Sequence, residues 1–540
     1  LYGVRGLKLK NVYRLIGHPC RTLYGVRELK RLQEIAACNG TEGKVSFGYG
    51  CKGNGEYIQM RHIKLSLVGK LLLAVIFTLM LSVWSGQERI SSAEADELSW
   101  TLYEAEYADS VGTTVKQLRP GYSGDGYVTD FERAGDAVHF TVTVAEDGFY
   151  PLRVGYASPY GDKTNFVEVN GTMAAETMFV SSDSFTEIEL GLVELDEGEN
   201  RIDISTYWGY FDVDYIKLGE RRERQPVPVI EPTLVTPEPS REAIALMTYM
   251  TSKYGSAILT GQQRLAATEL DYIYAVSGKL PVISGFSAGE GMDDALQWAK
   301  YGGIVTMEWH WYAPSDGYHW AASETEFDVE RAVTPGTREY ELTIADIDRM
   351  AAQLLLLKEA GVPVLWRPLH EAEGRYFWWG EKGPEATKKL YNLLFDRFVY
   401  THGLNNLIWV WTTSDTVYSK DWYPGDDRVD ILGVDRYMRD GDYSPLTNVY
   451  DKLNELAGGK KLVAYTENGP IPDPREMRRS KTGWMYFNTW AGKFITDGLI
   501  NSRHHIRVVY NHPYAITLDE FPSELIYGRP PEPYPAGNKR

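Results

Sequence analysis

Cysteine is almost missing from this chain of 540 residues: the three that it has, Cys20, Cys38 and Cys51, all precede Met60. From Met60 onward the chain can form no disulfide bond and can offer no zinc site of the common cysteine-containing kinds. The ten histidines show no metal-ligand spacing such as HExxH. The folded part must therefore be stabilised by large apolar cores, which two domains can supply.

Basic residues are also scarce outside the N-terminal segment. Residues 96–540 hold 42 Lys and Arg against 68 Asp and Glu, a formal net charge of −26. Such acidity disfavours nucleic acids and anionic polymers as partners, and it is compatible with a neutral polysaccharide.

Only one long apolar run exists, from Leu71 to Trp84. Basic residues precede it and the small-residue pattern Ala93-Glu94-Ala95 follows, so residues 60–95 are predicted to be a secretory signal peptide cleaved after Ala95. An uncleaved membrane anchor is the alternative, although the run is short for a span. Residues 1–59 repeat LYGVR and lack periodicity, so we expect translated sequence upstream of the true start.

Two motifs place glutamates beside strand-like runs. Glu371 lies in LWRPLHEAEGRYFWWG and Glu467 in AYTENG, each at the end of an apolar run and each followed by Gly. Hydrolysis of a glycosidic bond takes two carboxyl groups, and Tyr376, Trp378 and Trp379 supply flat faces for sugar rings. The motifs indicate a glycoside hydrolase. The alternative is a pair of surface carboxylates beside a Trp pair that packs in the core.

Strands and helices alternate around these motifs. Eight apolar runs have strand length: Ala257–Thr260, Pro281–Phe286, Gly303–Met307, Pro363–Leu369, Asn406–Thr412, Val429–Val434, Lys461–Thr466 and Ile506–Tyr510. Helical periodicity marks Thr343–Ala360 (with a Thr343/Asp346 capping pattern), Glu385–Tyr400, Leu446–Ala457 and Trp484–Thr496. The alternation predicts a parallel (β/α)8 TIM barrel. The candidate residues then fall at the C-terminal strand ends, where barrel enzymes keep their chemistry: Gln262, His310, Glu371, Trp411, Tyr437, Glu467 and Tyr510.

The sequence of these motifs resembles that of glycoside hydrolase family 26, best known for endo-β-1,4-mannanases, and the resemblance covers residues 239–530. The resemblance implies that Glu371 is the general acid/base and Glu467 the nucleophile of a retaining, double-displacement mechanism that needs no cofactor. It also implies that Tyr437 hydrogen-bonds the nucleophile, and that His310, His370 and Arg367 line the site, the last two positioning the carboxyl groups. Departures from the family are Tyr376, which replaces a Trp near the substrate, Glu373, which replaces a small or amide residue, and Tyr510, which stands where an aromatic platform is expected.

The resemblance implies a mannan-type substrate (mannan, galactomannan or glucomannan) for a monomeric enzyme. Two alternatives remain. The same chemistry could act on β-1,3-xylan or mixed-linkage β-glucan, or the barrel could bind polysaccharide without hydrolysing it.

Residues 96–218 differ in composition. Short alternating runs, Ala137–Val144, Tyr150–Tyr156, Phe166–Asn170 and Arg201–Thr206, predict a jelly-roll-like antiparallel β-sandwich, so the fold class is multidomain. The segments YEAEYA, GYSGDGYV, FVEVNG and WGYFDVDYIKL resemble carbohydrate-binding module family 35. That resemblance implies a structural Ca²⁺ held by Glu104, Glu106 and Asp214, unless these are solvated carboxylates; Trp208 and Tyr210 are sugar-stacking or core aromatics. Residues 219–238 are expected to form a stiff Pro-rich linker, and 531–540 a C-terminal tail.

Overall fold

The computed structural model describes residues 99–207, 209–265, 267–315, 319–414 and 418–535. The predictions for residues 1–59, for the signal peptide at 60–95, for Trp208 and for the end of the tail concern positions outside these ranges. Within the described part of the chain, no helix combines the length and the apolar character needed to cross a membrane.

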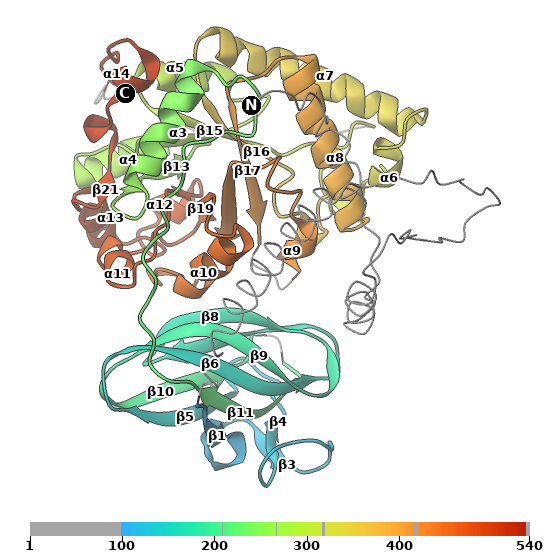
Figure 1. The fold of residues 1–540 in the computed structure, drawn as a ribbon, viewed down its shortest axis with the longest axis vertical. Coiled ribbons are helices and arrows are strands. Elements are labelled where there is room, and N and C mark those ends of the chain that lie inside the picture. Colours follow the sequence, from blue (N-terminus) through green and yellow to red (C-terminus); the bar gives the residue numbers. More distant parts are fainter. Residues whose placement is uncertain (1–98, 208, 266, 316–318, 415–417, 536–540) are drawn as a thin grey trace, which may run out of the picture. The chain divides into compact units, whose positions relative to one another are not determined.

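Residues 101–218 form the predicted β-sandwich, coloured blue to green in Figure 1. Its strands are β1 (Thr101–Glu104), β2 (Asp109–Val111), β3 (Thr114–Lys116), β4 (Tyr127–Thr129), β5 (Ala137–Val144), β6 (Gly148–Ser158), β7 (Lys163–Val169), β8 (Thr172–Phe179), β9 (Ser182–Leu195), β10 (Gly198–Ser205) and β11 (Asp212–Leu218), with the short helix η3 (Ala105–Tyr107). One sheet has the order β3-β4-β11-β6-β9 with β1 on β11, and the other has the order β2-β5-β10-β7-β8. Alternate residues of β5 are buried, as expected for a strand with one face on the core.

The rest of the chain closes into an eight-stranded parallel barrel in the order β13-β14-β15-β16-β17-β18-β19-β20 (Figure 1). Its strands are β13 (Gly261–Gln263), β14 (Ile283–Ser287), β15 (Ile304–Trp309), β16 (Val364–Pro368), β17 (Leu407–Thr413), β18 (Ile431–Arg436), β19 (Leu462–Asn468) and β20 (Phe487–Thr489). β12 (Ile258–Leu259) and β21 (Ala515–Ile516) pair with each other outside the barrel. The predicted TIM barrel is confirmed.

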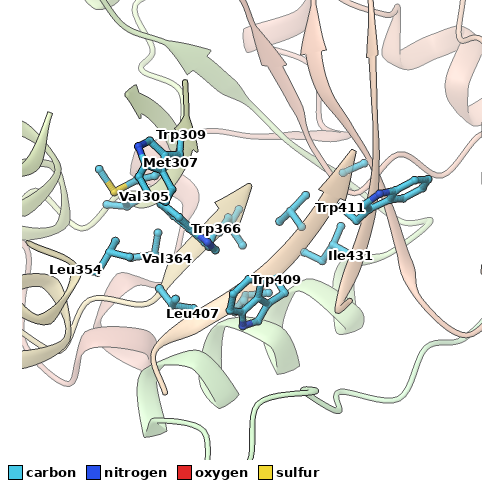
Figure 2. Close-up of a cluster of buried hydrophobic side chains, with 14 of the residues drawn as sticks. Val305, Met307, Trp309, Leu354, Val364, Trp366, Leu407, Trp409, Trp411 and Ile431 are labelled. Atoms are coloured by element: carbon cyan, nitrogen blue, oxygen red, sulfur yellow. The ribbon is translucent and has the colours of Figure 1, made fainter. Parts of the chain in front are cut away.

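The helices are α3 (Arg241–Lys253), α4 (Thr268–Ser277), α5 (Met292–Lys300), α6 (Val329–Ala332), α7 (Arg338–Glu359), α8 (Pro384–Asp396), α9 (Ser419–Trp422), α10 (Thr447–Leu456), α11 (Pro474–Arg479), α12 (Lys493–Thr496), α13 (Arg503–Tyr510) and α14 (Ser523–Tyr527), with the short helices η4 (Ala322–Glu324), η5 (Ala372–Gly374), η6 (Arg397–Thr401) and η7 (Leu518–Glu520). Large apolar side chains fill the layer between strands and helices, as Figure 2 shows. The ring of Trp366 lies 5.8 Å from that of Phe398, and the ring of Trp409 lies 4.8 Å from that of Phe395.

Four predictions of local structure are wrong. Ile506–Tyr510 belongs to helix α13, whose N-cap Ser502 accepts a hydrogen bond from the backbone N–H of His505. The eighth strand is β20, which lies inside the stretch predicted as a helix at 484–496, and the first barrel strand is β13 rather than 257–260. Helix α7 begins earlier than expected, because Thr337 is its N-cap.

The linker contacts the barrel. Ile230 is buried in the barrel's apolar core, and the backbone N–H of Val235 donates to the buried carboxyl of Asp430 at 2.7 Å. This part of the linker is therefore held against the barrel by specific contacts.

Candidate active site

The two candidate catalytic glutamates lie at the C-terminal ends of the fourth and seventh barrel strands. Glu371 follows β16, and Glu467 is the last residue but one of β19. Oxygen atoms of Glu371, Glu467 and Asp435, which is on β18, all lie within 4.8 Å of one another. The fold thus brings together the two carboxyl groups that the motifs paired, and it adds a third.

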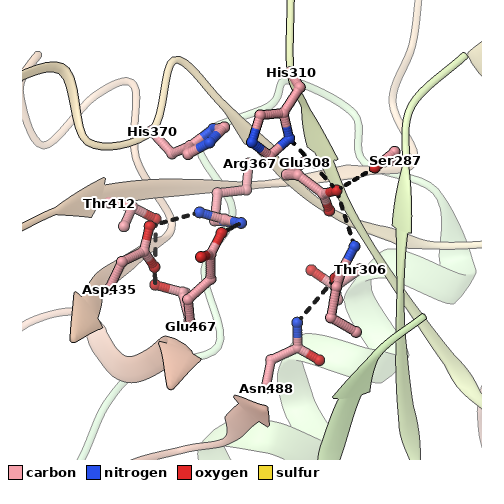
Figure 3. Close-up of polar contacts among 12 residues, drawn as sticks. Ser287, Thr306, Glu308, His310, Arg367, His370, Thr412, Asp435, Glu467 and Asn488 are labelled. Atoms are coloured by element: carbon pink, nitrogen blue, oxygen red, sulfur yellow. Dashed lines mark hydrogen bonds and ion pairs between the residues drawn. The ribbon is translucent and has the colours of Figure 1, made fainter. Parts of the chain in front are cut away.

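The Glu467 carboxyl is held by two donors. The Tyr437 hydroxyl donates to Oε2 at 2.6 Å, as the sequence predicts, and the Arg367 guanidinium donates to Oε1. Both oxygens are engaged, so the carboxyl group has a fixed orientation. Figure 3 shows the contact with Arg367.

The surroundings of the Glu371 carboxyl favour its protonated form. Burial, followed by the nearby charge of Glu467, raises the pKa of Glu371 to about 8. Glu371 is therefore protonated at neutral pH and can donate a proton. Two carboxyl groups whose environments differ in this way are suited to separate acid and nucleophile roles.

Arg367 is the cation at the centre of the site. Its side chain is 3% exposed, and it donates to Asp435 at 2.7 Å as well as to Glu467. Burial acts to lower the pKa of Arg367, but the carboxylates of Asp435, Glu467 and Glu308 raise it overall. The guanidinium stays charged and compensates the carboxylates buried around it.

Asp435 is a site residue that the sequence analysis missed. Its carboxyl accepts hydrogen bonds from Arg367 and, at 2.7 Å, from the Thr466 hydroxyl. The segment GVDRY pointed to it, because Tyr437 had been assigned to the site and Asp435 lies only two residues earlier, near the end of β18. A register shift between Val434 and Asp435 re-aims this strand end.

Two histidines lie beside the acid. The rings of His310 and His370 are 4.6 Å apart and nearly perpendicular. Burial, followed by the charges of Arg367 and His310, lowers the pKa of His370 well below its usual value, so this ring is neutral. The hydrogen bond expected from His370 to the carboxyl groups is not among those of the described residues, and its buried Nδ1 has no partner there.

A polar network behind the histidines was not predicted. Glu308 is buried and accepts hydrogen bonds from Gln263 at 2.9 Å and Ser287 at 2.6 Å, while its Oε1 lies 3.8 Å from His310 Nδ1. Asn488 donates to Gln263 at 3.2 Å, so the network crosses from β20 to β15 (Figure 3). It holds one side of the barrel mouth rigid.

Exposed aromatic side chains surround the site. Tyr376 is 44% exposed, Trp320 39% and Tyr437 38%. The rings of Trp320 and Trp490 lie 6.5 Å and 6.1 Å from that of His310. Trp320 and Trp490 were missed, although Trp490 directly follows β20 and would have been found had that strand been assigned.

The Trp pair after the acid does not line the substrate path. Trp378 and Trp379 are fully buried. Their indole N–H groups donate to the backbone oxygens of Trp311 at 2.7 Å and His370 at 3.1 Å. The prediction that they stack on sugar is wrong, and the core-packing alternative holds. They support the loop that carries the acid.

Trp411 and Tyr510 are also core residues. The neighbour of Trp411, Thr412, faces the barrel interior and meets Thr466, so Trp411 points outward into the layer of Figure 2, 5.2 Å from the ring of Tyr423. Tyr510 is 1% exposed on helix α13, away from any strand end. Neither can contact a substrate directly.

The sandwich holds the other predicted residues. Tyr210 is 54% exposed with a positive φ, and its ring lies 6.3 Å from that of Tyr160. The Ser123 backbone N–H donates to both oxygens of Asp214 at 3.0 Å, and the Ser123 hydroxyl donates to Glu104 at 2.6 Å. The loop of Ser123 thus contacts acidic residues of β1 and β11, which are far apart in the sequence and paired in the sheet.

The two groups of acidic residues differ in the distances between their carboxyl oxygens, which bears on whether either could hold a cation. Among the described residues, the acidic group with all ligand oxygens within 4.8 Å is Glu371, Asp435 and Glu467, and Arg367 already compensates that group. Glu104, Glu106 and Asp214 do not form so tight a group.

Comparison with known proteins relates this site and fold to two families. The model of "Glycosyl hydrolase family 26" matches residues 235–520, and that of "Carbohydrate binding module (family 35)" matches residues 101–220. A mannan endo-1,4-beta-mannosidase of Thermothelomyces thermophilus is 40% identical over 458 residues, which cover 81% of this chain and 93% of the relative.

Two solved structures agree in fold. A Podospora anserina GH26-CBM35 beta-(1,4)-mannanase aligns with a TM-score of 0.54 and 38% identity, over 78% of this chain and 98% of its own. A ruminal GH26 endo-beta-1,4-mannanase aligns with a TM-score of 0.59 and 28% identity, over the same shares, 78% and 98%.

Proposed function

Because this chain belongs to glycosyl hydrolase family 26, we propose that it is an endo-β-1,4-mannanase that hydrolyses mannan-type polysaccharides with retention of anomeric configuration. The relative and the two aligned structures carry mannanase in their names, which supports the substrate class. The observation that carries the mechanism is the pairing of Glu371 and Glu467, one protonated and one held by two donors, with oxygens within 4.8 Å.

The first step forms a covalent intermediate. The Glu467 carboxylate attacks the anomeric carbon while Glu371 gives its proton to the glycosidic oxygen, so that bond breaks and the rest of the chain leaves as an alcohol. Inverting enzymes keep their carboxyl groups about 6.5–9.5 Å apart to admit a water molecule, and retaining enzymes keep them about 5–5.5 Å apart. The short separation here supports retention.

The second step releases the product. Once Glu467 is esterified its negative charge is gone, which removes one cause of the raised pKa of Glu371. Glu371 then deprotonates a water molecule that attacks the anomeric carbon, and Glu467 leaves as a carboxylate. Tyr437 and Arg367 keep the Glu467 oxygens aligned through both steps.

Reducing-sugar release from a panel of polysaccharides tests the function. We expect release from mannan, galactomannan and glucomannan, and little from β-1,3-xylan or mixed-linkage β-glucan. Preferred hydrolysis of either of the last two would replace the substrate assignment and keep the mechanism. No release from any of the polysaccharides, by protein whose melting is cooperative, would favour a non-hydrolytic binding role.

We also propose where the enzyme acts, in which oligomeric state, and what the sandwich does. The apolar run before residue 96 supports secretion after removal of residues 60–95. We propose that the mature enzyme acts outside the cell as a monomer, and that the sandwich binds polysaccharide near the exposed Tyr210. A separate binding domain raises the effective concentration of the barrel at an insoluble substrate.

A structural Ca²⁺ in the sandwich is a further part of the proposal. Glu104 and Glu106 each have a buried carboxyl oxygen with no hydrogen-bond partner among the described residues. A Cβ at Gly124 would lie 2.3 Å from a Glu106 oxygen, so the loop backbone closes tightly over the carboxylates. Burial, helped by the charges of Glu104 and Glu106 and opposed by the hydrogen bond from the Ser123 backbone, raises the pKa of Asp214 to about 7. Oxygen ligands of this kind suit calcium.

Chelation of calcium should therefore destabilise the sandwich. Without the cation, ionised Asp214 faces two other carboxylates, so we expect chelator to lower the melting temperature of this domain in the full chain, and most strongly above pH 7, where Asp214 is ionised. Added Ca²⁺ should restore it. In the Asp214→Asn variant, chelator should have little effect. Equal responses of parent and variant, or none in the parent, would remove the metal site.

A further inference from the structure

Glu373 is a buried acidic residue that the proposed mechanism does not use. It lies two residues after Glu371, in the short helix η5. Its Oε1 accepts hydrogen bonds from the hydroxyl of Thr413, the last residue of β17, and from that of Ser419 at 3.4 Å, the first residue of α9. The carboxyl group thus joins the loop after the fourth strand to the end of the fifth.

The loop that Glu373 joins to β17 is strained. Leu369, Glu371 and Arg375 all have left-handed backbone conformations, with φ of 52°, 51° and 56°. Such conformations are unfavourable for residues other than glycine, and they persist only where surrounding contacts impose them. The general acid itself is one of these three residues, so its position depends on what fixes the loop.

Hydrogen bonds hold the loop on both sides of the acid, among them backbone bonds from Gly374 to Glu371 and from Arg375 to Ala372. The Trp379 indole donates to the backbone oxygen of His370 on one side of the acid. On the other side, the side-chain hydrogen bonds are those of Glu373 with Thr413 and Ser419. Burying a carboxyl group is costly unless hydrogen bonds compensate it. The hydroxyls of Thr413 and Ser419 supply such hydrogen bonds, and through them Glu373 ties the loop of the acid to the end of β17.

We propose that Glu373 is a positioning residue for the general acid: it ties the strained loop of Glu371 to the end of β17 and keeps a buried carboxyl group beside it. This rests on the acid role of Glu371 in the proposed function. A loop that shifts by a fraction of an ångström moves the proton donor away from the glycosidic oxygen, which slows the step that needs the proton.

Charge supports the same role. Glu371 is surrounded by Glu467 on β19, Asp435 on β18, Arg367 on β16 and Glu373 in its own loop. Glu467 and Glu373 raise the pKa of Glu371 and Arg367 lowers it, after burial as the largest cause. Burial raises the pKa of Glu373 itself, and the Thr413 and Ser419 hydroxyls oppose that shift. The ionised fraction of Glu373 thus helps to keep Glu371 protonated.

Two variants separate the tether from the charge. Thr413→Val removes the hydroxyl donor and keeps the side-chain shape. Glu373→Gln keeps an acceptor for both hydroxyls and removes the charge. Glu381→Gln, at an exposed glutamate paired with Lys382, is the matched control. Each is assayed on mannan, whose leaving group needs a proton, and on an aryl β-mannobioside with a dinitrophenolate leaving group, which does not.

For Thr413→Val we expect about a tenfold loss of kcat/KM on mannan and near-parental kcat/KM on the aryl substrate, because kcat/KM reports the first step and the dinitrophenolate needs no proton there. For Glu373→Gln we expect the basic limb of kcat/KM on mannan to move down by about half a pH unit or more. Glu381→Gln should match the parent in both. If Glu373→Gln fails to fold, the substrate dependence of Thr413→Val decides alone.

The Glu371→Ala variant tells a failure of this inference from a failure of the proposed function. If Glu371→Ala lowers kcat/KM equally on both substrates, Glu371 is not the acid and the proposed function falls. If it spares kcat/KM on the aryl substrate, the acid role stands. In that case, equal slowing of both substrates by Thr413→Val, or no slowing at all, overturns the positioning role of Glu373, as does an unmoved basic limb in a folded Glu373→Gln variant.

Discussion

Replacing Glu467 with alanine should abolish mannan hydrolysis, with a loss of about 10⁴-fold or more, because no group then forms the covalent intermediate. Replacing Glu371 should cost about 10²–10⁴-fold on mannan, the range of general acid–base catalysis. Azide should rescue both variants when the leaving group is activated. In Glu467→Ala the azide attacks in one displacement and gives the α-mannosyl azide. In Glu371→Ala it opens the covalent intermediate and gives the β-mannosyl azide.

Thermal unfolding provides the control for these variants. Arg367 keeps Asp435 as a partner in both variants, so melting temperatures should stay close to that of the parent. Activity near the parental level in either variant, or the same azide anomer from both, would contradict the assignment of roles.

Loss of Arg367 should be the most destabilising single change in the site. Arg367→Met leaves Asp435 and Glu467 buried without their cation, and breaking a buried pair in this way costs about 3–5 kcal/mol. Denaturant unfolding measures the change. Arg221→Met is the matched control, because the side chains of Arg221 and its partner Glu223 are 40% and 74% exposed and such surface pairs contribute about 0–1 kcal/mol.

The pH dependence of the Arg367→Met effect has a definite sign. Without the cation, the folded-state pKa of the buried Asp435 carboxyl lies further above its unfolded value, since burial already raises it and Arg367 opposes that shift. A group with a raised folded pKa binds more protons when folded, so the penalty shrinks as the pH falls. The destabilisation should be larger at pH 8 than at pH 5. A loss of stability equal to that of Arg221→Met, at either pH, would show that Arg367 does not compensate buried charge.

The sequence predicted most of the barrel because its buried strands are apolar runs that end in polar residues. Runs such as 363–369 and 461–466 have no competing interpretation, and the two glutamates follow from them. The eighth strand was missed because β20 has three residues, while the stronger apolar run at 506–510 forms an amphipathic helix. Short apolar runs do not distinguish strand from helix by themselves.

The aromatic residues were harder to place for a related reason. Successive strand residues face opposite sides, so Trp411 points to the helices once Thr412 points to the barrel interior. Which of two neighbouring residues faces the barrel interior depends on the strand register, and the sequence alone does not determine the register. Trp378 and Trp379 lie in a loop whose path is set by tertiary contacts. Their burial could therefore not be predicted from the local sequence. Asp435 was missed because its partner Arg367 comes from a strand far away in the sequence.

If Glu371 and Glu467 cleave β-1,4-mannan with retention, the first anomer released is β. Proton NMR of mannohexaose hydrolysis, recorded within minutes of adding enzyme, separates the α and β anomers of the new reducing ends before they equilibrate. We expect the β anomer to appear first and the α anomer to follow by mutarotation. Initial release of the α anomer would mean inversion, and it would contradict the assignment of Glu467 as a nucleophile.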